Sequence, residues 1–232
     1  MRKITIITAA LLFVFVSAYA QGDGEGTDFL TKGLRYAGGS FGITVDNEKH
    51  ESGGTSSDGP KTTNFNILPV AGYAFSDKFV AGLGIGFASM STKTIDTNPS
   101  SGDEIELKNK YNQFVIKPMI GYYKRITNRL YCMPYFYFGF GFGSSTNESY
   151  DYFEDKITET KASLNSFEVG LEGSLKYFIA KEWAFTLSYG KLFYNNTTQK
   201  PKDSSSDEKW TNSSYGLDLD LSSVNIGLVY TF

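Results

Sequence analysis

Apolar and polar residues alternate at every second position along most of this chain. The clearest case is residues 135–143, YFYFGFGFG, where four phenylalanines share one face and tyrosine or glycine occupies the other. Such a period of two is typical of a β-strand whose two faces meet different surroundings. The pattern therefore predicts a strand here and an all-β fold wherever the same alternation recurs.

Seven further segments alternate in the same way, which predicts eight strands in all. In the first and last segments the phase of the alternation slips, at Gly38-Gly39 and at Ser222-Ser223. A bulge or bend would be tolerated at both places, so we expect one at each; the alternative is that a strand ends there. The seven segments are residues 34–45, 64–75, 79–88, 113–122, 167–177, 183–193 and 217–232.

The connections between these segments are alternately short and long. Short connections lie at 76–78, 125–129 and 180–182, and long polar ones at 46–62, 93–110, 144–164 and 195–214. In an up-and-down meander, all the long connections then lie at one end and both termini at the other. This is the plan of an outer-membrane barrel, with short periplasmic turns and long external loops.

A soluble eight-stranded barrel of the lipocalin kind is the main alternative, and it would hold the apolar face inside. The interior of an eight-stranded barrel is only just wide enough for side chains. Faces rich in phenylalanine and leucine would not fit there, whereas the glycine, alanine, serine and threonine faces would. An apolar band of this extent would cause aggregation in water, so it must face lipid. The predicted fold class is an all-β, eight-stranded antiparallel up-and-down transmembrane β-barrel.

The outward aromatic residues also fall into two rows, as expected for the girdles at the two membrane interfaces. One row lies near the short turns and the other near the long connections. The first row is Tyr73, Phe75, Phe79, Tyr122, Tyr177, Trp183, Tyr230 and Phe232, and the second is Phe65, Phe87, Phe114, Phe142, Phe167 and Phe193.

The N-terminal residues 1–20 have the pattern of a cleaved signal peptide. Arg2 and Lys3 precede an apolar run too short for a spanning helix, and Ala18-Tyr19-Ala20 supplies small residues before a cleavage site. We expect residues 21–232 to be a single barrel domain, exported across the inner membrane to the outer membrane. Losing Arg2 and Lys3 moves the formal charge from −3 to about −5, which argues against a nucleic-acid partner.

Three stretches of the chain resemble the small outer-membrane β-barrel family of Gram-negative bacteria, which includes the OmpX-like and OmpA transmembrane barrels. They are the signal ending at Ala18-Tyr19-Ala20, the F-x-I-x-P-x-I-G-Y run at 114–122, and the final G-L-V-Y-T-F. The resemblance implies that Tyr230 and Phe232 form the signal read by the barrel-assembly machinery. It also implies a monomer whose other partners are outer-membrane lipids and lipopolysaccharide.

Charged residues project into the predicted lumen, where they must be paired or hydrated. We expect a network that joins Lys117 and Lys176 to Glu172, with Tyr135 or Tyr137 donating hydrogen bonds. Two roles fit this network, a structural plug or a narrow polar path for small solutes. The inward residues predicted by the alternation are Arg35, Lys117, Tyr135, Tyr137, Glu168, Glu172 and Lys176.

The function that these features indicate is non-catalytic: a structural or surface-interaction role, or passive small-solute permeability. No motif in the chain indicates a cofactor or a metal site. The alternative is a lipid-modifying enzyme, because some small outer-membrane barrels use a loop or rim histidine with serine. The chain's single histidine, His50, has Ser52, Ser56 and Ser57 nearby, and Glu48 or Glu51 could orient it.

Overall fold

The structure, a computed structural model, describes residues 31–52, 55–98, 102–202, 208–218 and 225–232. The predicted signal peptide lies outside these residues. No helix among the described residues is long and apolar enough to cross a membrane. The strands are β1 (Arg35–Ser52), β2 (Thr55–Ala74), β3 (Phe79–Thr97), β4 (Glu104–Tyr122), β5 (Lys124–Arg125), β6 (Leu130–Cys132), β7 (Tyr135–Asp151), β8 (Lys156–Phe178), β9 (Trp183–Pro201), β10 (Trp210–Asp218) and β11 (Asn225–Thr231).

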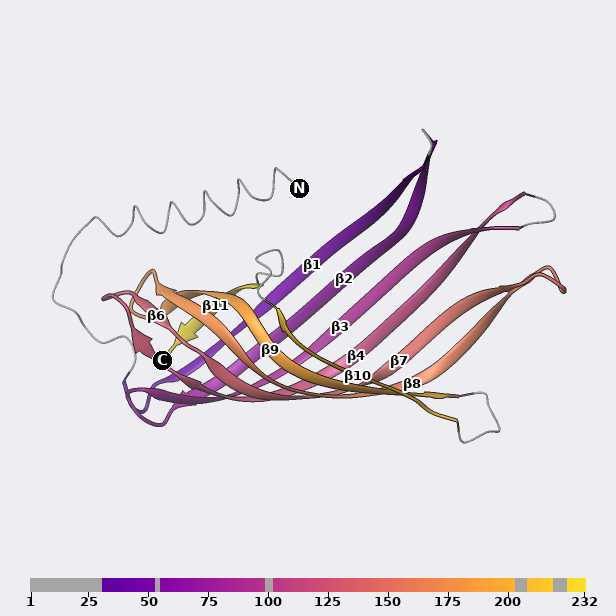
Figure 1. Cartoon of the computed structure of the whole chain (residues 1–232). Coiled ribbons are helices and arrows are strands. Elements are labelled where there is room, and N and C mark those ends of the chain that lie inside the picture. The colour runs from indigo at the N-terminus through magenta and orange to yellow at the C-terminus, as the bar shows by residue number, and fades with distance from the viewer. Residues whose placement is uncertain (1–30, 53–54, 99–101, 203–207, 219–224) are drawn as a thin grey trace.

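The strands form one antiparallel sheet that closes on itself (Figure 1). Each of β1, β2, β3, β4, β7, β8 and β9 pairs with the next in that order. Strand β9 then pairs with β11 along its first half and with β10 along its second half, and β11 pairs with β1. Strands β10 and β11 thus share the eighth position, and the prediction of an eight-stranded up-and-down barrel is confirmed.

The turn between β4 and β7 is longer than the sequence pattern indicated. It contains a small hairpin in which β5 pairs with β6, and β6 also pairs with β8. Tyr131 of β6 lies opposite Lys176 of β8, so β6 continues the wall where β7 has not yet begun. Pro134 separates β6 from β7, as expected of a residue that cannot donate to the ladder.

The four long connections were predicted as loops, and this prediction is wrong for most of their length. Strands β7 and β8 stay paired as far as Asp151 and Lys156, and β3 and β4 as far as Thr97 and Glu104. A segment with polar residues on both faces resembles a loop in the sequence. Beyond the membrane, however, both faces of a β-hairpin meet water, so a strand there can be polar on both faces. Threonine-rich segments favour strands there, and the ladder satisfies their backbone groups.

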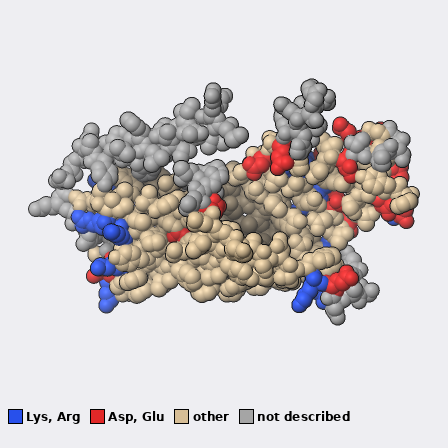
Figure 2. All heavy atoms as spheres, in the orientation of Figure 1, with Lys and Arg blue, Asp and Glu red and all other residues tan. Residues whose placement is uncertain are grey.

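The alternation of residue types in the sequence corresponds to an alternation of buried and exposed side chains in the structure. Along β7 the residues from Tyr135 to Phe142 are buried and exposed in turn, and Phe138 retains 42% exposure on the outside of the barrel. The outer surface between the two charged ends is a broad belt almost free of Lys, Arg, Asp and Glu (Figure 2). The phenylalanine face is therefore the lipid-facing wall, as predicted.

The first strand has a different phase from the one predicted. Its pairing with β2 runs without a shift from Arg35 to Asn47, so there is no bulge at Gly38-Gly39. Arg35 is exposed on the outside, opposite Tyr73, and the prediction that it projects inward is wrong. Tyr36 points inward instead and is only 4% exposed. The prediction failed because Tyr36, a large aromatic residue, was taken as lipid-facing, whereas its side chain fills the lumen.

A second correction concerns β9. The register shifts between Glu172 and Gly173 of β8, and opposite this shift Gly190 adopts a φ of +65°, which glycine reaches without strain. Beyond this bulge Leu192 is exposed outside, so Phe193 faces the lumen rather than joining the outer aromatic row. The predicted phase change in the last strand is present between Leu217 and Ile226, although Ser222-Ser223 lies outside the described residues.

Candidate functional site in the barrel lumen

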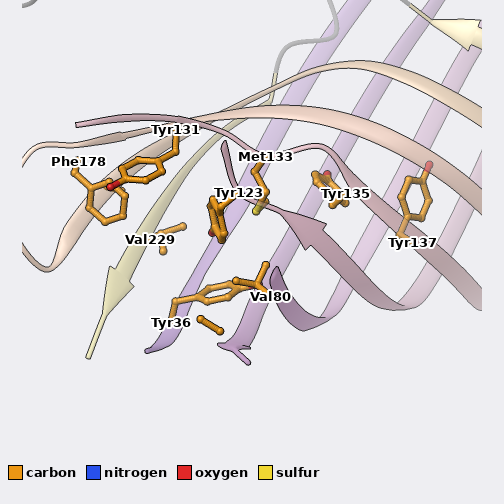
Figure 3. Packing of buried hydrophobic residues seen from close by; sticks show 11 residues of the cluster. Tyr36, Val80, Tyr123, Tyr131, Met133, Tyr135, Tyr137, Phe178 and Val229 are labelled. Atoms are coloured by element: carbon orange, nitrogen blue, oxygen red, sulfur yellow. The ribbon is translucent and has the colours of Figure 1, made fainter. Parts of the chain in front are cut away.

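Aromatic side chains fill the lumen at the short-turn end (Figure 3). The Tyr36 ring reaches from β1 across β2 and lies over Gly72, and its hydroxyl would be 2.6 Å from a Cβ placed on Gly82 of β3. The glycines of the inward face thus make room for tyrosine rings. We call the following residues the periplasmic plug: Tyr36, Val80, Tyr123, Tyr131, Met133, Phe178 and Val229.

Lys176 is embedded in this plug and is only 3% exposed. Its Nζ donates a hydrogen bond to the Tyr123 hydroxyl at 2.6 Å and lies 4.5 Å from the centre of the Tyr36 ring. The inward direction predicted for Lys176 is therefore right, but its Nζ donates to Tyr123 and not to Glu172 as predicted. An ammonium group among tyrosine rings is stabilised by the hydroxyl and by cation–π attraction.

Lys117 and Glu172 form the ion pair that the alternation predicted. The Nζ of Lys117 lies 3.2 Å from Oε2 of Glu172, and the two side chains are 14% and 12% exposed. The same ammonium lies 3.7 Å from the centre of the Tyr137 ring. The Tyr135 ring also borders the pair, with its centre 5.6 Å from the Lys117 ammonium. Both charges are thus compensated inside the barrel, as buried charges must be.

Glu168 is the centre of a second cluster. It accepts hydrogen bonds from the Tyr137 hydroxyl at 2.5 Å, from Lys191 Nζ at 3.2 Å and from Asn195 Nδ2 at 3.2 Å. Lys191 and Asn195 were not among the predicted lumen residues. The bulge at Gly190 turns them inward, and a glycine within an alternating strand is the signal that could have indicated it.

A cavity of about 450 Å³, lined by apolar as well as charged and polar residues, lies next to the plug, and Figure 2 shows a hollow near the middle of the molecule. Beside Gly141 the space is taken by Gln113, whose Nε2 donates to Ser166 Oγ at 2.6 Å. Beside Gly139 a Cβ would make an ordinary van der Waals contact with Glu168 Cβ at 3.4 Å, and this glycine lines the cavity. Charged and polar lining residues include Gln113, Lys117, Ser166, Glu168, Glu172 and Lys191.

The two residues of the predicted assembly signal lie where the barrel closes. The backbone of Phe232 exchanges two hydrogen bonds with Arg35, at 2.9 and 3.0 Å. The Tyr230 ring stacks on Phe232 and makes a tilted contact with Trp183, with centroid distances of 5.9 and 4.9 Å. Both aromatic residues thus belong to the outer row at the short-turn end, and their reading by the assembly machinery stays a prediction.

The residues of the enzymatic alternative lie on paired strands rather than in an open loop. His50 of β1 is opposite Ser57 of β2, and Glu51 is opposite Ser56. Only the backbone is described for these four residues. Within the described part of the chain, no group of three or more His, Cys, Asp or Glu side chains could hold a metal ion.

A closed ring of antiparallel strands, apolar outside and polar inside, defines the class of transmembrane β-barrels. The chain belongs to the outer membrane protein beta-barrel domain family, whose model matches residues 6–232. It is thus an outer-membrane protein. No curated protein matches the chain in sequence.

Several solved structures resemble the chain in fold. OprG of Pseudomonas aeruginosa is 16% identical, with 88% of this chain and 98% of that chain covered and a TM-score of 0.48. Ail of Yersinia pestis, the attachment invasion locus protein, is 12% identical over 87% of this chain and 100% of that chain, with a TM-score of 0.39. The outer-membrane protease OmpT of Escherichia coli is 10% identical over 86% and 97%, with a TM-score of 0.38.

Proposed function

We propose that this protein is a closed, non-catalytic outer-membrane barrel that acts at the cell surface through its external β-hairpins. The observation that carries the proposal is the periplasmic plug. Its tyrosines come from β1, from β6 and from the residue that follows β4, so they fill the lumen from different sides. An ion that entered the cavity would have to displace these rings and pass the side chain of Lys176.

The external hairpins support the second half of the proposal. The hydroxyl of Tyr152, at the tip that joins β7 to β8, donates to Asp96 of β3 at 2.6 Å. Asn98, which follows β3, donates to the Tyr150 hydroxyl at 3.3 Å. These contacts tie two neighbouring hairpins together above the membrane. They supply a preformed surface, and a preformed surface binds a partner with a smaller entropic cost than a mobile loop does.

Passive permeability for small solutes is the competing role, and electrical recording separates the two. Purified protein in a planar lipid bilayer should give no steady conductance. Replacing Tyr36 and Tyr123 together by alanine should open the plug and produce stable single-channel steps. Replacing the outward Phe138 by alanine is the matched control, because it removes an aromatic ring without touching the lumen. A steady conductance of the unmodified protein would contradict the proposal.

A further inference from the structure

The β7–β8 hairpin ends in three aromatic residues that lie well beyond the lipid-facing wall, the first of them eight residues after Phe142. The rings of Tyr150 and Tyr152 pack edge to face, with their centres 5.1 Å apart. Phe153 follows in the turn and is 101% exposed, so its ring is as open to water as it would be in an extended peptide. Such a ring adds nothing to the stability of the fold, because it removes no apolar surface from water. We call Tyr150, Tyr152 and Phe153 the aromatic tip.

The backbone around Phe153 is held in place by local hydrogen bonds. The Asp151 carboxylate accepts the backbone N–H of Phe153 at 2.9 Å and that of Glu154 at 3.3 Å, as aspartate side chains commonly do in turns. The Tyr150 hydroxyl donates to the carboxylate of Asp155 on the other side of the turn. The ring of Phe153 is therefore presented at a fixed place, and a partner that binds it avoids the entropic cost of ordering the turn.

Carboxylates surround the aromatic tip, and they come from two hairpins. The Tyr152 hydroxyl donates to Asp96 of β3 at 2.6 Å, so the end of the β3–β4 hairpin contacts the tip. Figure 2 shows acidic side chains gathered at the ends of the external hairpins. Six carboxylates and one ammonium give residues 96–104 and 150–156 together a net charge of −5. The acidic residues are Asp96, Asp103, Glu104, Asp151, Glu154 and Asp155, and the basic residue is Lys156, which pairs with Glu154.

An arginine side chain matches both parts of this surface. Its guanidinium stacks on an aromatic face by cation–π attraction and binds carboxylates through paired N–H groups. A metal ion would use the carboxylates without the ring, and among the described residues no three acidic side chains are grouped to hold one. An apolar partner would cover the ring but would take water from the carboxylates without supplying a counter-charge. The chemistry of the surface therefore selects a cationic polypeptide.

We propose that the aromatic tip and its carboxylate rim bind an arginine-bearing, cationic polypeptide at the cell surface, with Phe153 as the anchor. The inference rests on the surface role proposed above and names the chemistry of the partner. The net charge attracts and orients a basic partner, and it acts mainly on the rate of association. The exposed ring supplies the contact that holds the partner once it has arrived, as aromatic residues do at the centres of interfaces.

The test measures binding of fluorescein-labelled octa-arginine by fluorescence anisotropy at about 0.15 M salt, where exposed charges further apart than about 8 Å are largely screened. The full chain is held in nanodiscs of phosphatidylcholine, which has no net charge and does not itself attract the peptide. One variant, Phe153→Ala, removes the anchor. A second, the rim variant, combines Asp103→Asn, Glu104→Gln and Glu154→Gln. A heat-dependent gel shift verifies that each variant is folded.

The matched controls make the same kinds of change on other external strands. Trp210→Ala removes an exposed aromatic side chain at the start of β10. The second control combines Asp46→Asn, Glu48→Gln and Glu208→Gln, and it removes three exposed acidic side chains away from the two hairpin ends. Labelled octa-lysine and octa-glutamate replace octa-arginine in parallel titrations.

The unmodified protein and both controls should bind octa-arginine with Kd values that agree to within about two-fold. Phe153→Ala should raise the Kd about ten-fold, as the loss of an anchoring aromatic residue does. The rim variant should raise the Kd at least about ten-fold and reduce its dependence on salt. Octa-lysine should bind more weakly than octa-arginine, because an ammonium lacks the planar, bidentate geometry. Octa-glutamate should not bind.

Three results would overturn the proposal. If Phe153→Ala bound like the unmodified protein while the rim variant did not, the attraction would be one of charge alone, without an anchor. If the acidic control lost as much affinity as the rim variant, the site would not be at these two hairpin ends. If the unmodified protein failed to bind octa-arginine, this inference would be wrong. The surface role itself would stand, because the bilayer recording tests it separately.

Discussion

The Lys117–Glu172 pair allows a quantitative test of how the lumen is stabilised. The perturbation is a double-mutant cycle of Lys117→Met, Glu172→Leu and the two changes together. These replacements keep similar volume and remove one charge, the other charge, or both. The two atoms of the pair are 3.2 Å apart, and little of either side chain meets solvent. The cycle therefore measures the pair in a largely enclosed site.

The expected magnitudes follow from this geometry. Each single change leaves one charge enclosed without its partner, which costs about 3 kcal/mol. Removing both charges costs about 1 kcal/mol or less, because well-packed apolar residues replace a buried pair with little loss. The coupling energy, the sum of the two single effects minus the effect of the double change, should therefore be about 5 kcal/mol. Attraction between Lys117 and the Tyr137 ring remains in Glu172→Leu and should make this the milder of the two single changes.

The assay is urea unfolding in lipid vesicles, followed by the fluorescence of Trp183 and Trp210. The matched control is the same cycle at Lys161 and Glu159, which are 3.3 Å apart but 56% and 47% exposed. An exposed pair should couple by no more than about 1 kcal/mol. Single changes in the lumen that add to within about 0.5 kcal/mol would refute the reasoning, since additive effects mean that the two residues do not interact.

Two further predictions follow from the structure. Gly72→Ala should lower the free energy of unfolding by about 1–3 kcal/mol, because the added methyl group would overlap the Tyr36 ring. The control is Gly139→Ala, whose Cβ would be 3.4 Å from its nearest neighbour. In the same unfolding assay it should change the free energy by less than about 0.5 kcal/mol. In the external hairpins, the hydrogen bond to Asp155 raises the pKa of Tyr150 above its usual 10.0, so this contact should persist at neutral pH and weaken only as pH rises through the raised pKa. Asp155→Asn should lower the pKa of Tyr150 towards its ordinary value. A titration of tyrosinate absorbance, with Tyr150→Phe as the blank, measures this shift. Identical titrations of Asp155→Asn and the unmodified protein would contradict the prediction.

The sequence predicted the fold well because a barrel of this size permits few arrangements. The interior is narrow, so the face with the smaller side chains must point inward. The alternate phenylalanines from Phe136 to Phe142 must therefore point outward. The same reasoning found the Lys117–Glu172 pair, because both residues lie in segments with an undisturbed period of two. Where no bulge interrupts a strand, the alternation alone is sufficient to predict which side chains point inward.

The predictions of side-chain direction are wrong where a bulge interrupts the alternation, or where the size of a side chain suggests one face and its actual surroundings are on the other. Gly190 introduces an extra residue in β9, so Lys191 and Asn195 enter the lumen and Phe193 turns inward. Tyr36 is large enough to suggest the lipid face, yet it fits inside because Gly72 and Gly82 on two neighbouring strands leave room for it. Such complementarity between residues on different strands is not visible in any one segment alone.

The interior of this barrel changes character along its axis, and the change explains the use of glycine on the inward face. At the short-turn end, glycines accommodate rings, and the rings exclude water around Lys176. Further along β7, the tyrosines end at Tyr137 and the glycines begin, and the space opens into a cavity held by two ion-paired clusters. Charges can be maintained there because each carboxylate has a lysine as its partner, and Glu168 also accepts a hydrogen bond from Tyr137. The glycines of YFYFGFGFG therefore mark the level at which an aromatic interior gives way to a polar one.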